Sequence, residues 1–279
     1  MNRELATVLF GLAASLAWGS GDFSGGLATR RASALSVVVA AHAIGLVLLV
    51  ILALAWSEAF PSTLDMLWGG AAGVAGTIGL VSFYRALAVG RMGITAPITA
   101  VIAAAVPVIV GAFLQGLPGL LQCIGFILAL IAVWFVSRPE GVVGRPEGLG
   151  LALLAGLGFG SFFVLIGQAS PTAIFWPLAA ARVTSFLFTL ALVLMRRQEI
   201  LPKLTTFPLV LLAGVLDVAG NAFFVMATHT GRLDVAAILS SLYPAATVLL
   251  AWIILRERVS RWQGLGILLA LIAIPLISA

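Results

Sequence analysis

The stretch QCIGFILALIA, from Gln122 to Ala132, returns as QGLGILLALIA, from Gln263 to Ala273, at a distance of 141 residues. The same offset, without a gap, aligns further small and aromatic residues along the chain: Gly19-Ser20 with Gly160-Ser161, Gly73 with Gly214, Gly79 with Gly220, Phe83 with Phe224, Ala86 with Ala227 and Gly90-Arg91 with Gly231-Arg232. A long repeat of this kind indicates duplication of a structural unit. We therefore expect two homologous halves, residues 1–138 and 142–279.

The composition indicates that lipid covers most of the surface. The 279 residues are 62% hydrophobic and 9% charged, with a mean hydropathy of +1.20, whereas a soluble domain carries about 25% charged residues. Fifteen basic and ten acidic side chains are too few to cover the exterior of a soluble fold of this length. We therefore expect an all-α, polytopic membrane protein.

Breaks in hydropathy divide the chain into ten apolar segments, each close to the roughly 20 residues that a spanning helix needs. The expected helices cover residues 5–26, 34–56, 66–89, 93–115 and 117–137 in the first half, and 148–169, 175–195, 207–229, 234–255 and 261–278 in the second. Because five is odd, the second half enters the membrane from the opposite side. Such inverted five-helix repeats are a transporter architecture, with a substrate site near mid-membrane between the halves.

The basic residues predict the orientation of the chain. Arg3 and Arg232 lie on the side of the two termini, whereas eleven basic residues lie on the other side: Arg30, Arg31, Arg91, Arg138, Arg145, Arg196, Arg197, Lys203, Arg256, Arg258 and Arg261. The positive-inside rule makes this second side cytoplasmic and puts both termini outside. The net charge of +5 thus reflects membrane orientation, and we expect no nucleic-acid partner.

Motifs for enzymes, cofactors and metals are missing from the sequence. It contains no GxxxxGK[ST] phosphate loop and no HExxH motif. Cys123 is the single cysteine, which excludes an internal disulfide and a cysteine metal cluster. We therefore expect no enzymatic activity, no cofactor and no metal site.

Ionisable residues in the expected helices are costly in a bilayer, by roughly 2.5–3.5 kcal/mol at mid-helix, so they mark candidate functional positions. Asp217 falls deep in the eighth helix, with Asn221 one turn later on the same face. Asp217 either faces a cavity or pairs with Arg85 or Arg182. A guanidinium is a fixed fork of donors that suits a carboxylate, so Arg182 is also a candidate anchor for an anionic solute. Arg85 is near enough to its helix end to snorkel.

Two further titratable residues lie in the first two expected helices. Asp22 belongs to the glycine-rich run GSGDFSGG, where it is either a proton or cation site or a partner of the following Arg30 and Arg31. His42 titrates near neutral pH when exposed, which suits a transport site, although a lone histidine on an apolar helix also fits the core.

Aromatic residues inside the spans are candidates to line a cavity and stack on an organic solute, with helix packing as the alternative reading. They are Trp18, Tyr84 and Tyr243. Prolines are expected to kink the fourth and ninth helices, because each frees a backbone carbonyl. They are Pro97, Pro107 and Pro244.

Together with the ten spans and the repeat, two stretches resemble the drug/metabolite transporter superfamily, EamA type. They are WGSGDF, from Trp18 to Phe23, and LLAWIILRERVSRWQGLGILLALIAI, from Leu249 to Ile274. The similarity covers the whole chain. The turn from Arg256 to Arg258 is similar to the Gly-Glu-Arg turn that often ends the fourth helix of an EamA half, with Arg256 where glycine is usual. The resemblance implies a solute carrier with a central cavity, often an exporter.

The expected function is secondary active transport of a small organic metabolite, outward and by alternating access, with protons as candidate coupling ions. The candidate substrate-binding residues are Trp18, Asp22, His42, Tyr84, Arg182, Asp217, Asn221 and Tyr243. Two alternatives stay open: an uncoupled exchanger of carboxylate-bearing solutes, and a non-transporting receptor or scramblase. We expect a monomer or homodimer in a prokaryotic cytoplasmic (inner) membrane.

Overall fold

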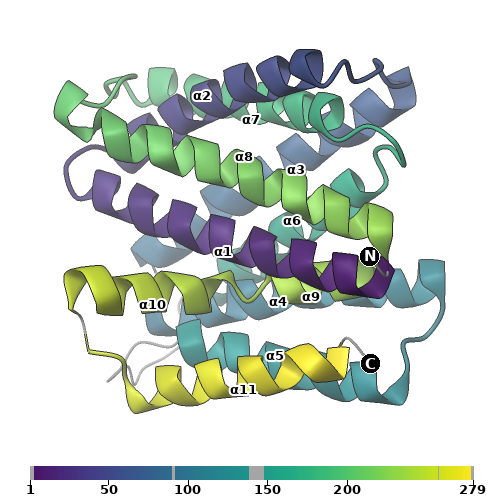
Figure 1. Cartoon of the computed structure of the whole chain (residues 1–279). Helices are drawn as coiled ribbons and strands as arrows, with labels where there is room; N and C mark the ends of the chain where they lie inside the picture. Colours follow the sequence, from purple (N-terminus) through teal and green to yellow (C-terminus); the bar gives the residue numbers. More distant parts are fainter. Residues whose placement is uncertain (1–2, 90–91, 138–147, 257, 278–279) are drawn as a thin grey trace.

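The fold is helical throughout the part of the chain that the structure describes, residues 3–89, 92–137, 148–256 and 258–277 (Figure 1). It is a computed structural model, which describes the side chains of these residues except Tyr84, residues 87–89 and residues 92–97. The helices are α1 (Arg3–Thr29), α2 (Ala34–Ala55), α3 (Thr63–Val89), α4 (Met92–Gln115), α5 (Leu120–Ser137), α6 (Leu149–Gly167), α7 (Phe175–Met195), the short 3₁₀ helix η1 (Leu204–Thr206), α8 (Phe207–Thr230), α9 (Leu233–Ser240), α10 (Tyr243–Leu255) and α11 (Arg261–Ile277).

Most of these helices are long and apolar enough to cross a membrane, and they begin and end within a few residues of the expected segments. Among the described residues, eight helical segments meet the criteria of length and hydropathy, with α9 and α10 counted as one segment, Leu233–Leu255. The remaining two are α11, which is apolar but shorter, and α1, which contains the polar run GSGDFSGG. The chain is therefore an integral, multi-pass membrane protein.

The ninth expected helix, 234–255, is interrupted. α9 ends at Ser240 and α10 begins at Tyr243, and Pro244 occupies the first turn of α10, where its missing N–H needs no partner. The kink expected at Pro244 is thus a break between two helices. By contrast, α4 continues through Pro107, and the side chain of Pro97 lies outside the described residues.

Helices of the two halves pack against each other more than against their own neighbours. α1 lies along α8, α3 lies along α6, and α5 lies beside α11 (Figure 1). Glycines allow the last approach: a Cβ added to Gly125 would lie 2.7 Å from Cγ1 of Ile277, and one added to Gly266 would lie 2.7 Å from Cγ2 of Val136. Small residues at such contacts let membrane helices pack closely without a hydrophobic driving force.

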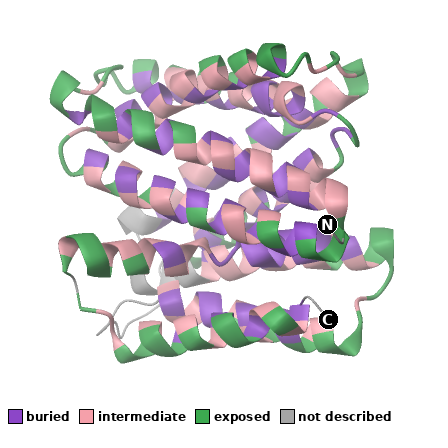
Figure 2. Ribbon diagram, viewed as in Figure 1, coloured by how far each residue is buried: buried purple, intermediate pink, exposed green. Residues whose placement is uncertain are grey.

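The two sides of the bundle differ in charge. We call the side where α1 begins and α11 ends the terminal side, at the right of Figure 1. The basic side is opposite and contains Arg30, Arg31, Arg196, Arg197, Lys203, Arg256, Arg258 and Arg261. Between the two, buried residues line the helix contacts and exposed ones face outward (Figure 2). Large apolar side chains are prominent among the exposed residues, as expected of a surface in lipid.

The α5–α11 contact makes a direct test of this packing. Gly266→Ala is expected to lower the melting temperature of the detergent-purified protein, because the new Cβ would meet Val136 and the backbone of Ala132 at 2.7–2.8 Å and overpacking costs about 1–3 kcal/mol. Gly264→Ala on the same helix is the control, since a Cβ there meets no atom within 4 Å. Both changes raise helix propensity equally, so equal melting temperatures would contradict the predicted contact.

Candidate functional site

An ion pair between α7 and α8 lies in the interior of the bundle. Nη2 of Arg182 donates a hydrogen bond to Oδ2 of Asp217. Gly45 of α2 makes room for the arginine, because a Cβ there would lie 3.4 Å from Arg182 Nε. The Arg182 side chain is 11% exposed and that of Asp217 is 41% exposed. The guanidinium is therefore buried behind the carboxylate, and the carboxylate is partly exposed.

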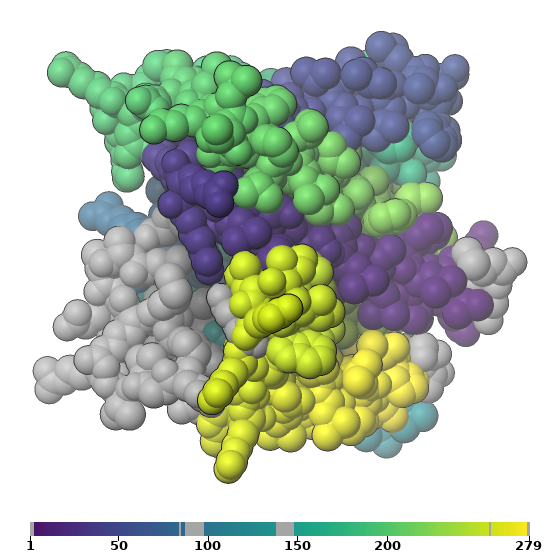
Figure 3. All heavy atoms as spheres, turned by 60° about the vertical axis from the view of Figure 1, so that its left-hand side comes forward, coloured from purple at the N-terminus to yellow at the C-terminus, as the bar shows by residue number. Residues whose placement is uncertain are grey.

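Asp22 brings a second carboxylate to the same region. The preceding residue, Gly21, packs on α8, where an added Cβ would lie 3.6 Å from the backbone nitrogen of Asp217. Asp22 is exposed and lies within Coulombic range of Asp217 and of Tyr243, the first residue of α10. Figure 3 shows α1 passing between α8 and α10. The carboxylates of Asp22 and Asp217 and the guanidinium of Arg182 thus lie in the same region of the bundle.

An aromatic layer lies under the two carboxylates, on their terminal side. The ring of Trp18 on α1 is 5.5 Å from that of Phe163 on α6 and 5.9 Å from that of Phe224 on α8, and the two phenylalanine rings are 4.9 Å apart. Phe224 is fully buried and Phe163 nearly so. Trp18 is one turn closer to the terminal side than Asp22. The three rings therefore close the interior directly beneath the charged residues.

The other predicted site residues have different surroundings. Asn221 is 4% exposed, and its amide donates to the Asp217 carbonyl over 2.6 Å, so it supports α8 itself. His42 on α2 lies within Coulombic range of Arg182, and its buried Nδ1 has no hydrogen-bond partner among the described residues. Arg85 is exposed, and the Tyr84 side chain lies outside the described residues.

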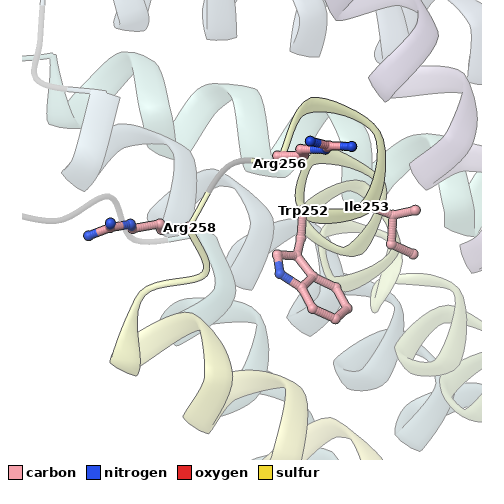
Figure 4. A pocket seen from close by; sticks show the side chains of 4 residues that line it. All are labelled: Trp252, Ile253, Arg256 and Arg258. Carbon is pink, nitrogen blue, oxygen red and sulfur yellow. The ribbon is translucent and has the colours of Figure 1, made fainter.

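Two pockets open at the rim of the basic side. One, of about 270 Å³, lies between the α1–α2 and α7–α8 connections and includes Arg31 and Lys203. The other, of about 340 Å³, is lined by Trp252 and Ile253 of α10 with Arg256 and Arg258 (Figure 4). The two guanidinium groups in Figure 4 point away from each other, so they do not converge on one anion. Neither pocket is lined by a predicted site residue.

Sequence reasoning missed a set of polar contacts on the terminal side. Arg232 and the fully buried Asp234 form an ion pair at the α8–α9 junction, and Glu58 bonds to the start of α7. These residues lie at the ends of the expected spans, where charges are ordinary interfacial residues. The repeated Gly-Arg pair, Gly231-Arg232, was the one available signal, and it did not reveal what the arginine contacts.

Comparison with known proteins supports the resemblance. Residues 146–279 match the EamA-like transporter family. An uncharacterized protein of Methanocaldococcus jannaschii, MJ1333.1, is 28% identical over 130 residues, which cover 47% of this chain and 93% of that protein. A crystal structure described only as that of a protein superposes with a TM-score of 0.79 over 97% of this chain and 95% of its own, at 17% identity. That last similarity shows the fold alone.

Because the two side chains of the ion pair differ in burial, we expect the two single substitutions to lower the stability of the protein unequally. Asp217→Asn is expected to destabilise the protein more than Arg182→Gln, because it leaves a buried guanidinium unpaired, whereas the second leaves a partly solvated carboxylate. In the double variant the losses should not add, with a coupling of about 0.5–3 kcal/mol. Unfolding in detergent, monitored for all four proteins, measures this cycle. Additive losses would show that the two side chains do not interact.

Proposed function

We propose, on the premise that residues 146–279 belong to the EamA-like transporter family, that the chain is a secondary transporter of small organic solutes. Members of this family are membrane transporters of the drug/metabolite type rather than enzymes. The observation that carries the proposal is the group formed by Arg182, Asp217 and Asp22. Ionisable residues in membrane helices face interior pathways and mark the sites of substrates or ions.

The contacts between the halves support an inverted repeat of residues 1–138 and 142–279. α1 packs on α8 as α6 packs on α3, which are the equivalent helices. The Gly125–Ile277 contact is matched by the Gly266–Val136 contact, in which each residue is replaced by the one 141 positions away. The relative from Methanocaldococcus jannaschii is about half as long as this chain, which is consistent with a five-helix half being the repeated unit. Two such halves can exchange conformations, which is alternating access.

The charges favour a solute with a positively charged group. Arg182 is buried and bonded to Asp217, so its guanidinium does not face the open space. The exposed groups are the carboxylates of Asp22 and Asp217, and when both are ionised the charges of the three side chains sum to one negative charge. Tyr243 lies within Coulombic range of Asp22, and an aromatic ring in this position would attract a cation. An amine or quaternary ammonium group complements this site better than a carboxylate does.

The same geometry supports a proposal for the direction and the coupling of transport. The basic side is cytoplasmic under the positive-inside rule, and the carboxylates lie on the basic side of the aromatic layer. A carboxylate that binds a cation from the cytoplasm and a proton from outside would export amines in exchange for protons. Asp217 and Asp22 are the residues for this exchange, and a prokaryotic cytoplasmic membrane supplies the proton gradient.

A thermal-shift screen tests the solute class. Spermidine and tetraethylammonium are expected to raise the melting temperature of the wild type more than succinate does. The shift should shrink at least several-fold in Asp217→Asn and stay unchanged in Asp65→Asn, which alters an exposed cap of α3 on the terminal side. A larger shift with succinate that depends on Arg182 would instead favour the carboxylate exchanger.

Counterflow in liposomes tests transport and coupling, with the amine that gives the largest thermal shift as substrate. Wild-type protein is expected to show saturable exchange and uptake driven by a pH gradient. Asp217→Asn or Asp22→Asn should lose the dependence on the gradient. An unchanged dependence in both variants would remove the proton-coupling hypothesis, and no saturable flux for any amine or carboxylate would favour the receptor or scramblase alternative.

A further inference from the structure

We propose that the structure is the state open to the basic side, and that Arg232 is a releasable latch that holds the terminal side shut. The inference rests on the proposed transport function, because a latch of this kind matters for a protein that alternates between two openings. It assigns a role to residues that the solute site does not use. Three features carry it: the exposure along α1, the contacts of Arg232, and a second set of contacts that differs from them in kind.

Exposure along one face of α1 changes abruptly at the aromatic layer. This face consists of Thr7, Gly11, Ala14, Trp18, Asp22, Gly26 and Thr29. The three residues before Trp18 are buried, whereas the three after it are exposed. A Cβ on Gly26 would meet no atom within 4 Å, while one on Gly11 would lie 2.8 Å from Cβ of Leu239. This face of α1 is therefore exposed from the basic side down to Asp22 and buried from Ala14 to the terminal side, with Trp18 between the two.

Arg232 ties two connections of the terminal side together. Its Nη1 and Nη2 donate to the carbonyl oxygens of Gln115 and Gly116, at 3.1 and 2.6 Å, at the end of α4. Its Nε and Nη2 also bond to Asp234, at 2.6–3.2 Å, on α9. The hydrogen bond to Asp234 raises the pKa of the Arg232 guanidinium above its usual value, so the cation persists at all physiological pH values. One charged fork thus joins the α4–α5 connection to the α8–α9 junction.

The two sets of hydrogen bonds made by Arg232 differ in how easily they break. The bonds from Arg232 to Gln115 and Gly116 are exposed, so water can replace them when the connections separate. The bonds to Asp234 hold a carboxylate that is fully buried, and their loss would leave that charge unpaired. The latch therefore opens by release of the two carbonyls and of the Leu233 N–H, which donates to Oε1 of Gln115 over 2.9 Å. The Arg232–Asp234 pair stays intact on its own helix.

Glu58 forms the second set of terminal-side contacts, and these are part-buried, whereas the bonds from Arg232 to the two carbonyls are exposed. Its carboxylate accepts hydrogen bonds from the backbone N–H groups of Ile174 and Phe175, at 2.5–3.1 Å, and thereby caps α7. The indole of Trp176 donates to the Glu58 carbonyl over 3.1 Å. Nε2 of His229 donates to the Ser170 carbonyl over 2.6 Å and joins α8 to the same connection. These helices therefore move as one body when Arg232 releases.

Distance measurements between spin labels test the latch directly. In a Cys123→Ala background, labels at Gly119→Cys and Thr172→Cys span the Arg232 contact; both positions are exposed, and a Cβ on Gly119 meets nothing within 4 Å. Labels at Ala59→Cys and Thr172→Cys span the Glu58 contact instead. Arg232→Ala is expected to add a longer Gly119–Thr172 component that is absent or minor in the parent, with the Ala59–Thr172 distance unchanged.

Two further variants keep the test decisive if Arg232→Ala does not fold. Arg232→Lys retains the charge but loses the fork, and is expected to show a smaller increase of the same long component. Glu58→Gln is expected to lower the melting temperature without adding that component. Parent-like Gly119–Thr172 distances in both Arg232 variants would overturn the proposal, and so would an equal increase in Glu58→Gln.

The distances and the fluxes separate the latch from the transport function. Longer distances in Arg232→Ala without saturable flux in the wild type would support the latch as a structural device and contradict the transporter. Saturable amine flux with unchanged distances would support the transporter and contradict the latch.

Discussion

Close approach of helices from opposite halves is the constraint on which the rest of the structure depends. Lipid is as apolar as the side chains, so burial of leucine does not hold membrane helices together, and contact area and hydrogen bonds must do so. Glycines such as Gly125 and Gly266 bring backbones within reach of a neighbouring side chain. Hydroxyl groups then bond across the contact, as from Thr247 to the Gly19 carbonyl over 3.0 Å. The tight α1–α8 and α3–α6 pairs follow from this chemistry.

That packing also sets the charge of the interior. Because α1 approaches α8 at Gly21, Asp22 comes into Coulombic range of Asp217. Because α2 has a glycine at Gly45, the guanidinium of Arg182 fits behind Asp217 rather than beside a solute. Under the proposed function, one base buried behind one of two acids gives a site that favours cations. With a different helix spacing, Asp22, Asp217 and Arg182 would favour a solute of a different charge.

The aromatic layer and the terminal-side polar contacts have different roles in the proposed carrier. Trp18, Phe163 and Phe224 pack against each other at the centre, where they would exclude water in the proposed carrier. Arg232 and Glu58 act at the helix ends, where water competes more for exposed hydrogen bonds than for part-buried ones. In the proposed carrier, apolar packing would seal one side and a small number of polar bonds would hold it shut.

The sequence by itself determined the solvent, the helices and the family. Lipid follows from composition, the spans follow from hydropathy, and the match of residues 146–279 agrees with the family suggested by the WGSGDF and RER stretches. Composition, hydropathy and short motifs are local properties of the sequence, and they can be read without knowing which helices pack together. The repeat was also visible in the sequence as a fixed offset of 141 residues. How the two repeated segments pack against each other could not be read from that offset.

Only the tertiary structure decided which charges pair and which face open space. Arg85 and Arg182 were both candidate partners for Asp217 in the sequence, and the fold selects Arg182 because its side chain reaches Asp217 past Gly45 of α2. Asn221 shares a helical face with Asp217, yet it is buried against its own helix. Arg232 looked like an ordinary interfacial residue until the end of α4 was seen to accept its hydrogen bonds. Pairing between residues more than a hundred positions apart depends on helix packing, which has no local signature.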